Sequence, residues 1–212
     1  MPFIVKNTTF PGPLDLLSPH SCRGCGRLGE PICECCKNNI FSQKSHRKLP
    51  QIYAVGDRDG LLGDIIHDYK YYSIRSLARP LAELLDLALP KNLPANSVII
   101  PLPTATHHIR ERGFDHTLKI AKNLSKIRHI PVKQILLRNK NTVQVGSDRK
   151  TRLAQATSAY ILNPKIKIDQ DTTYILLDDV LTTGASIMAG KRLLETAGAK
   201  NVRIAILALS RR

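Results

Sequence analysis

The chain has 212 residues, of which 32 are Lys or Arg and 17 are Asp or Glu, so its formal net charge is +15 at pH 7. Hydrophobic residues make up 42% of the chain and charged residues 23%, which excludes wholesale disorder, a collagen-like repeat and a coiled coil. At roughly 150 residues per domain, this length predicts one domain with an accessory module.

The excess of positive charge favours anionic partners, which include nucleic acid, nucleotides, sugar phosphates and acidic membrane surfaces. A solvated basic face without a ligand is the alternative. The sequence contains no run of about 18 uncharged apolar residues, and no basic segment followed by an apolar stretch near its start. We therefore expect neither a membrane span nor a signal peptide, and a cytoplasmic location.

The first part of the chain is predicted to form a module of its own. Residues 1–18 are polar and contain two prolines, so they are predicted to form an arm or loop. All five cysteines follow between Cys22 and Cys36, and a basic linker comes after them. We place a domain boundary near residue 49, with the arm, a metal-binding module and the linker in residues 1–49 and a second domain in residues 50–212.

Beyond this boundary, short apolar runs alternate with segments of helical spacing, which predict strands and helices respectively. In chain order they are a strand at residues 51–55, a helix at 74–89, a strand at 97–100, a helix at 114–127, strands at 134–137 and 174–177, a helix at 185–197 and a strand at 202–209. Pro80 falls in the first turn of the first helix or kinks it, and Gly198 closes the last helix. Residues 139–157 are polar and have no apolar stripe.

Strands separated by helices predict an α/β fold with a mostly parallel sheet and helices on both faces. Ligands of such sheets bind at the carboxyl ends of the strands. We therefore expect the chemistry to lie just after Ile100, Leu137 and Leu177.

The cysteine cluster contains two Cys-x2-Cys pairs, with glycines beside them that allow tight turns. The paired residues are Cys22, Cys25, Cys33 and Cys36. Four thiolates at this spacing can converge on one Zn²⁺, whereas a disulfide scaffold would spread its cysteines along the chain. Four thiolates close the coordination shell, so the predicted zinc is structural and not catalytic. Cys35 is a surplus thiol unless it replaces Cys33 or Cys36, and His20 and His46 are alternative ligands.

Residues 174–186 carry the densest set of candidate ligand-binding side chains. An apolar run leads into Asp178 and Asp179, and a turn rich in hydroxyl groups then opens a helix. The residues of this turn are Thr182, Thr183, Gly184, Ala185 and Ser186. Hydroxyl donors, a glycine and the N-terminal amides of a helix together describe a phosphate-binding site.

The adjacent carboxylates Asp178 and Asp179 can accept hydrogen bonds from vicinal hydroxyls and hold a hydrated Mg²⁺. A phosphorylated pentose satisfies both the carboxylates and the turn. The alternative is that the two acids end a strand and that Thr183 or Ser186 caps the following helix.

The same residues resemble the thirteen-residue signature of type I phosphoribosyltransferases. The resemblance implies a parallel sheet with helices on both faces, and a ligand, 5-phosphoribosyl-1-pyrophosphate (PRPP), bound with Mg²⁺. By that match, Asp178 and Asp179 hold the ribose hydroxyls and residues 182–186 grip the 5′-phosphate.

The wider pattern resembles ComF-type competence proteins, a phosphoribosyltransferase-like family linked to DNA uptake and natural transformation. The segments that occur in the family's order are the four cysteines, residues 65–71, residues 101–103, residues 110–114 and the acidic motif, which is residues 174–186 with Asp178 and Asp179. This chain departs from the family in two places. Where the family usually reads RGFNQ, residues 112–116 read RGFDH, so that Asp115 and His116 replace Asn and Gln. A later family pattern appears here as Gln144, Arg152, Gln155 and Tyr160. These departures concern the base-side contacts more than the sugar-phosphate site.

Several basic residues are candidates for binding the pyrophosphate. Lys70 follows a predicted strand-and-turn region, and the resemblance places a lysine here in a loop facing pyrophosphate; the alternative is a solvated lysine at a helix end. Arg110 and Arg112 follow a Pro-rich turn, and guanidinium groups bind phosphate oxygens in pairs. Surface charge is the alternative for both arginines.

The polar stretch around residues 144–152 is long enough to be a flexible lid, and a solvated basic loop is the alternative. Its candidate residues are Gln144, Arg149, Lys150 and Arg152. The mechanism that the resemblance implies is displacement of pyrophosphate, with Mg²⁺, Lys70 and the lid arginines stabilising the leaving group. The sequence does not specify the acceptor base.

The competing hypothesis is a PRPP sensor without turnover, whose zinc module and basic surface bind single-stranded DNA or proteins of a DNA-uptake machinery. A basic stripe would favour it, and its residues would be Arg23, Arg27, Lys37, Lys44, Arg47 and Lys48. A structural adaptor with a degenerate site is a third hypothesis. Two roles are open for the tyrosines near Lys70: they stack nucleobases, or they anchor a half-buried strand or helix. These residues are Tyr69, Tyr71 and Tyr72. Analogy with type I relatives implies a homodimer.

Overall fold

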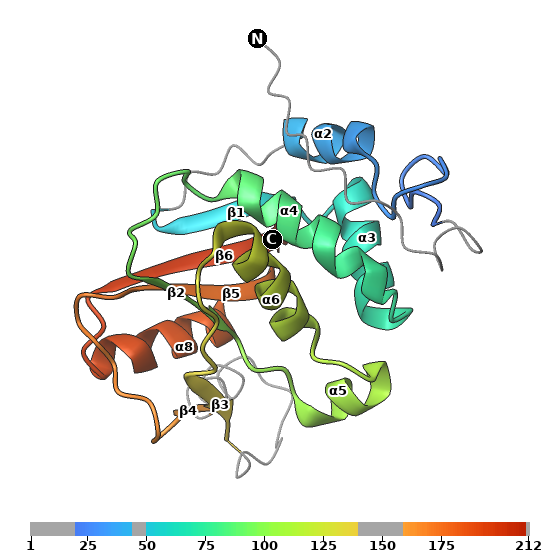
Figure 1. The fold of residues 1–212 in the computed structure, drawn as a ribbon. Helices are drawn as coiled ribbons and strands as arrows, with labels where there is room; N and C mark the ends of the chain where they lie inside the picture. The colour runs from blue at the N-terminus through green and yellow to red at the C-terminus, as the bar shows by residue number, and fades with distance from the viewer. Residues whose placement is uncertain (1–19, 44–49, 140–158, 211–212) are drawn as a thin grey trace.

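The computed structural model describes residues 20–43, 50–139 and 159–210. Its helices are α2 (Glu34–Ser42), α3 (Gly60–Tyr71), α4 (Ala78–Ala88), α5 (Thr106–Arg112), α6 (His116–Arg128) and α8 (Ala185–Thr196), with a 3₁₀ turn η1 (Arg75–Leu77) before α4. Its strands are β1 (Ile52–Asp57), β2 (Ser97–Pro101), β3 (Leu136–Arg138), β4 (Tyr160–Leu162), β5 (Thr173–Leu181) and β6 (Asn201–Leu209) (Figure 1).

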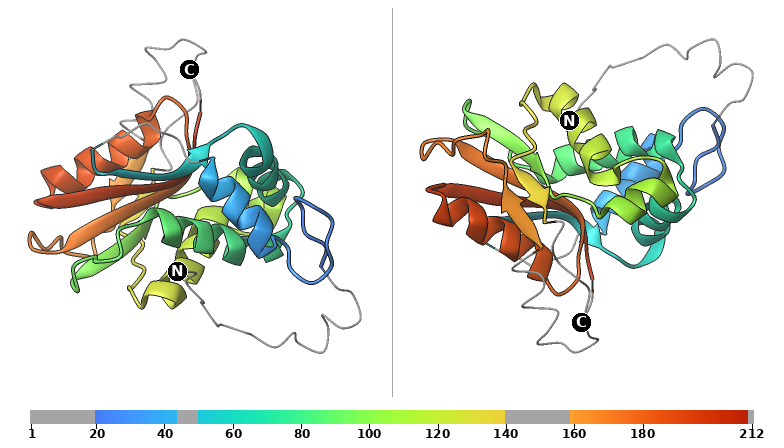
Figure 2. Two further views of the ribbon diagram at one scale, coloured as in Figure 1. Left: turned by 90° about the horizontal axis from the view of Figure 1, so that it is seen from above. Right: turned by 90° about the horizontal axis from the view of Figure 1, so that it is seen from below.

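Four strands form a parallel sheet in the order β1-β6-β5-β2. The central strands β5 and β6 are almost continuously buried, as expected for strands covered on both faces. Helices lie on both faces, α8 on one and α2, α4 and α6 on the other (Figure 2). The predicted α/β architecture is therefore confirmed.

Each face of the sheet has its own apolar core. One core packs side chains of α3, α4 and α6 against the sheet, and it also contains Cys22, Ile32 and Ile40 of the cysteine module. The other core packs α8 and the small antiparallel pair β3–β4 against the opposite face. The cysteine module thus shares a core with the α/β domain; the predicted boundary between them lies outside the described residues.

The predicted strand at residues 134–137 corresponds to β3, but it does not join the main sheet. It pairs antiparallel with β4, which the sequence analysis did not predict. The expectation that the sheet presents a strand end after Leu137 is therefore wrong. A three-residue strand carries too little periodicity to reveal its partner.

Helix α4 begins after η1, and Pro80 is its third residue. The first amides of a helix have no acceptor within the helix, so the missing N–H of proline costs nothing there. Of the two predicted positions for Pro80, the first turn is the observed one.

The outer edge of β2 is covered by residues 131–133. Val132 forms a parallel bridge to Ile99, and the main chain of Ile99 exchanges two hydrogen bonds with Pro131 and Lys133 at 2.9 and 3.0 Å. Among the described residues, no helix is both long and apolar enough to cross a membrane.

Candidate ligand site and metal centre

The acidic pair lies inside a strand and not in the turn behind it. Strand β5 continues through Asp178 and Asp179 to Leu181, with Asp178 still in register with Ile206 of β6. Neighbouring residues of a strand point to opposite sides of the sheet. Asp179 contacts side chains of α3 and α6, whereas Asp178 lies near Arg138 and the β3–β4 pair. The two carboxylates therefore have different surroundings.

Asp179 is buried and doubly paired. Asp179 is only 4% exposed. Its Oδ2 atom lies 2.9 Å from Nζ of Lys70 and 2.5 Å from Nε2 of His116. Burial alone would raise the pKa of Asp179, but the hydrogen bond from His116 and the charge of Lys70 outweigh burial and hold this pKa well below its usual range. Asp179 is thus an ionised carboxylate held by two helices.

Asp178 is half-buried, and its Oδ1 accepts a hydrogen bond of 2.9 Å from the backbone N–H of Asp179. Burial and the charge of Asp179 together raise the pKa of Asp178 to about 8. Two adjacent carboxylates titrate as a pair, and in this pair the proton resides on Asp178 at neutral pH.

The predicted phosphate-binding turn lies at the same end of β5. The strand ends at Leu181 and α8 begins at Ala185, and Gly184 between them has the left-handed φ of 77° that disfavours other residues. The hydroxyl-bearing residues Thr182, Thr183 and Ser186 are exposed. The turn therefore presents hydroxyls and the first amides of α8 beside Asp178, and the N–H of Ala185 donates to Oγ1 of Thr183 at 3.4 Å.

Lys70 lies in the last turn of α3, so the predicted strand-and-turn region before it is wrong. Apolar residues at 62, 65, 66 and 69 have helical spacing and are buried, and this signal could have identified the helix. The ammonium group of Lys70 is directed at Asp179. The structure thus brings Lys70 to the acidic pair.

Arg110 and Arg112 lie on α5, a short helix that the sequence analysis did not predict. Arg110 is exposed. Arg112 is buried, its NH1 group is 3.0 Å from Nδ1 of His116, and its guanidinium lies over the ring of Tyr71 at 5.7 Å.

The predicted lid residues Gln144, Arg149, Lys150 and Arg152 lie outside the described residues. The same holds for Lys44, Arg47 and Lys48 of the predicted basic stripe. Lys37 of that stripe is buried against Glu83, with 2.7 Å between their charged groups, so it adds nothing to an exposed basic surface.

Three residues near the acidic pair were missed by the sequence analysis or given no role at this site. His116 forms the contact to Asp179 described above, and its only sequence signal is the departure from the family pattern at this position. Arg138 and Tyr160 pair across β3 and β4, with the guanidinium 5.1 Å from the ring centre, and the Tyr160 hydroxyl is a hydrogen-bond partner of Ser186. Their proximity arises from tertiary packing, which local patterns do not report.

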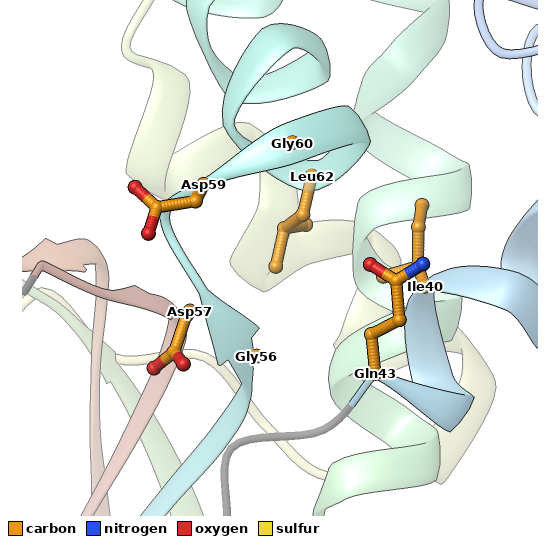
Figure 3. A pocket seen from close by; sticks show the side chains of 7 residues that line it. All are labelled: Ile40, Gln43, Gly56, Asp57, Asp59, Gly60 and Leu62. Carbon is orange, nitrogen blue, oxygen red and sulfur yellow. The ribbon is translucent and has the colours of Figure 1, made fainter.

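Two cavities lie near the carboxyl ends of the strands. One of about 150 Å³ is lined by Pro101, Thr104, Asp115 and Arg138, among others, and adjoins the ligand site. The other, of about 330 Å³, lies where α2 meets the end of β1, with Asp57 and Asp59 on one side and Gln43 on the other (Figure 3). This second cavity is at the junction with the cysteine module and not at the acidic pair.

The candidate metal centre consists of the four cysteines that the spacing predicts. Their sulfur atoms all lie within 4.8 Å of one another, and the Sγ atoms of Cys25 and Cys33 are 3.6 Å apart. Zn–S bonds of about 2.3 Å in a tetrahedron place sulfur atoms about 3.8 Å apart, so the cluster fits a thiolate-bound metal. Backbone N–H groups outweigh the effect of burial and lower the pKa of Cys22 to about 6. The donor set therefore suits zinc.

The surplus thiol Cys35 is exposed and lies outside this cluster, as does His20 among the described residues. His46 lies outside the described residues. The module is fixed to the domain by ion pairs: Arg23 contacts Asp68 of α3 at 2.5 Å, and Lys37 contacts Glu83 of α4. The cysteine module is therefore docked on α4 and on α3, whose last turn carries Lys70.

Comparisons with known proteins agree with this geometry. Residues 117–212 match the family model of the phosphoribosyl transferase domain. Competence protein F of Haemophilus influenzae is 26% identical over 190 residues, which cover 86% of this chain and 82% of that protein. Competence protein ComFC of Bacillus subtilis is 24% identical over 196 residues, which cover 89% of this chain and 78% of that protein.

Solved structures with similar folds include two phosphoribosyl-pyrophosphate enzymes. Glutamine PRPP amidotransferase from B. subtilis, complexed with ADP and GMP, has 16% identity and a TM-score of 0.45 over 66% of this chain, which spans only 30% of that chain. Purine phosphoribosyltransferase from Pyrococcus horikoshii Ot3 has 23% identity and a TM-score of 0.37 over 66% of this chain and 75% of that chain.

The sequence matches to the competence proteins extend over most of the chain, and the family model covers the acidic motif and the helix and strand that follow it. The four-cysteine cluster stands in the N-terminal part, where the resemblance places it. The chain therefore resembles ComF-type competence proteins over most of its length, and its residues 117–212 match a phosphoribosyl transferase domain.

Proposed function

We propose that the protein binds PRPP with Mg²⁺ at the carboxyl ends of β5 and β2 and transfers its phosphoribosyl group to a nitrogen nucleophile. One observation carries the proposal: the half-buried carboxyl of Asp178 lies beside the exposed hydroxyls of residues 182–186 and the first amides of α8. The carboxyl suits the ribose hydroxyls, and the turn suits the 5′-phosphate. The match of residues 117–212 to the phosphoribosyl transferase domain supports the same ligand.

In the proposed transfer, the bond between the anomeric carbon and pyrophosphate breaks as the bond to the nitrogen forms. Pyrophosphate leaves with the electron pair, and the carbon gains positive character. Lys70, Arg110 and Arg112 are proposed to compensate the charge on the leaving group, together with the predicted lid residues. Mg²⁺ would be held by Asp178, a hard oxygen ligand, and by ligand phosphates, where it would neutralise charge. Asp179 already has two cationic partners and is not proposed as a ligand of Mg²⁺.

The proposal is tested by calorimetric titration of PRPP and Mg²⁺ into the wild type and Asp178→Asn. We expect micromolar-range binding to the wild type and an affinity about 10- to 100-fold lower in the variant, since hydrogen bonds to a charged group are lost. Asp64→Asn, which changes an exposed carboxylate on α3, is the matched control and is expected to bind normally. Equal binding by Asp178→Asn and the wild type would contradict the proposed site.

The affinity for PRPP and Mg²⁺ is expected to depend on pH. Because the pKa of Asp178 is raised to about 8, this carboxyl is mostly protonated at pH 7 and must release its proton to bind Mg²⁺. The affinity should therefore rise by up to about tenfold per pH unit below pH 8 and level off above it. Titrations at pH 6.5 in buffers of different ionisation enthalpy should report the release of close to one proton. An affinity that is flat between pH 6 and pH 9 would rule out this role of Asp178.

We further propose that the four-cysteine cluster binds one structural Zn²⁺. Four thiolates leave no open coordination position for a substrate, so this metal stabilises the module and its docking on α3 and α4. The compact sulfur cluster and the burial of three of its four cysteines support the assignment.

A second proposed function is binding of single-stranded DNA, and an exposed aromatic group at the end of α3 favours it. Tyr71 and Tyr72 are 61% and 68% exposed, and both contact the ring of exposed His67, with centroids 4.8 and 5.6 Å apart. Arg112 lies against the Tyr71 ring. Exposed rings among cationic groups are the chemistry on which unpaired bases stack. Together with the competence relatives, this surface supports a role in DNA uptake and natural transformation in the cytoplasm.

The double variant Tyr71→Ala, Tyr72→Ala is expected to weaken binding of a fluorescent oligonucleotide at fixed salt by about 5- to 150-fold for each base that the two rings stack, given about 1–3 kcal/mol per stacked base. Leu87→Ala, which removes an exposed apolar side chain from α4, is the matched control. Anisotropy measurements at several salt concentrations separate stacking from phosphate contacts, because only the latter change the salt slope. Unchanged affinity of the double variant would exclude this surface as the DNA site.

A further inference from the structure

His116 occupies the centre of a buried network and has no role of its own in the proposed transfer. It is the first residue of α6 and only 6% exposed. Its Nε2 atom is 2.5 Å from Oδ2 of Asp179, and its Nδ1 atom is 3.0 Å from the NH1 group of Arg112. Its backbone carbonyl accepts a hydrogen bond of 2.8 Å from the hydroxyl of Tyr69. The residue is therefore held from three elements: its ring from α5 and β5, and its backbone from α3.

These contacts determine which ring nitrogen carries the proton. A guanidinium group has only donors, so Nδ1 of His116 must accept the hydrogen bond from Arg112. The proton is then on Nε2, which lies 2.5 Å from Oδ2 of Asp179 and 3.3 Å from the hydroxyl oxygen of Thr117. The hydroxyl of Thr104 lies 3.3 Å from Nδ1, but its proton is directed to Asp115, the N-cap of α6, at 3.0 Å.

The network continues from Asp179 to the carboxyl proposed to contact the ligand. The backbone N–H of Asp179 donates to Oδ1 of Asp178. A rotation of the Asp179 side chain shifts the negative charge that raises the pKa of Asp178. The Nζ atom of Lys70 also contacts Oδ2 of Asp179. The same carboxylate therefore sets the position of a proposed pyrophosphate-binding group.

We propose that His116 is a positioning residue of the ligand site: through its Nε2–H it orients Asp179, which in turn places the carboxyl of Asp178 and the ammonium of Lys70. This role rests on the proposed binding of PRPP. It assigns His116 no contact with the ligand.

Glutamine can replace the two hydrogen bonds of the neutral imidazole, since its oxygen can accept from Arg112 while its amide nitrogen donates to Asp179. Leucine fills a similar space and provides neither bond. The pair His116→Gln and His116→Leu therefore separates hydrogen bonding from packing. His129→Asn changes an exposed histidine with a left-handed backbone at the end of the same helix and serves as the control.

The experiment measures PRPP and Mg²⁺ affinity by calorimetry and records NMR spectra of the ligand-free protein. We expect His116→Leu to lose about tenfold in affinity, and His116→Gln to recover most of that loss. In the ligand-free wild type, ¹⁵N shifts should show the Nε2–H tautomer, and the Asp179 amide proton should resonate downfield. His116→Leu should move this amide signal, and His116→Gln should retain it.

An Nδ1–H tautomer, or an Asp179 amide signal that His116→Leu leaves in place, would overturn the positioning role. Equal affinities of the leucine and glutamine variants would also overturn it, because packing alone would then explain the site. If the wild type binds no PRPP, the proposed function fails, while the ligand-free spectra still decide whether His116 orients Asp179. Melting temperatures identify any variant that does not fold.

Discussion

Replacing Asp179 by asparagine is expected to lower the free energy of unfolding by about 3–5 kcal/mol, the range found when one partner of a buried ion pair is removed. The substitution leaves the ammonium of Lys70 without its counter-ion and leaves His116 facing a neutral amide. Asp179 is 4% exposed, so little water is available to replace the carboxylate. Urea unfolding followed by circular dichroism at pH 7 measures the loss.

Asp178→Asn is the matched comparison, one residue away on the same strand, and the opposite sign is expected. Because the folded-state pKa of Asp178 lies above the usual carboxyl value, the folded chain holds this proton more tightly than the unfolded chain. The stability of the wild type therefore falls between about pH 4 and pH 8 through this group, by at most about 1.4 kcal/mol per pH unit. Asparagine removes that loss, so the advantage of Asp178→Asn should grow up to pH 8.

The two variants thus separate stability from ligand binding. Asp178→Asn should be as stable as the wild type or more stable, and yet bind PRPP poorly. Destabilisation of the same size in both variants at pH 8 would mean that the two carboxyls share one environment, contrary to the contacts described for them.

Loss of the metal centre is expected to have the other large effect. Cys36→Ser should reduce bound zinc from one ion per chain to none and lower the melting temperature by about 10 °C or more, since structural zinc sites supply folding energy outright. Cys36 is buried, and the module to which it belongs packs into the same core as α3 and α4. Metal analysis and thermal unfolding with and without a chelator measure both changes.

Cys35→Ser is the control for this prediction, because Cys35 is the neighbouring exposed thiol outside the cluster. It should keep its zinc and its melting temperature. Zinc retained by Cys36→Ser, or lost from Cys35→Ser, would show that the ligand set is wrong.

The sequence allowed the parts of the site that are local in the chain to be predicted. The acidic motif, its turn and helix α8 occupy one continuous segment, and the four cysteines lie within fifteen residues, so their spacing alone places the donors. The strands β5 and β6 were found because they are continuous apolar runs.

The remaining part of the site depends on contacts between distant segments. Lys70 and His116 reach Asp179 from two helices, and no periodicity links positions so far apart. Helix α5 has seven residues and few apolar ones, so its helical state depends on packing more than on pattern. The continuation of β5 through two acids is possible because the carboxylates have partners, which the sequence does not display.

The covering of β2 by residues 131–133 has a consequence for self-association. An open edge of a sheet offers a row of unpaired amide and carbonyl groups to any other extended chain. At Ile99 both groups are already satisfied from within the molecule. Removal of this short segment would leave β2 able to pair with a second copy, so we expect its integrity to decide whether concentrated protein remains dispersed or forms aggregates through edge-to-edge pairing.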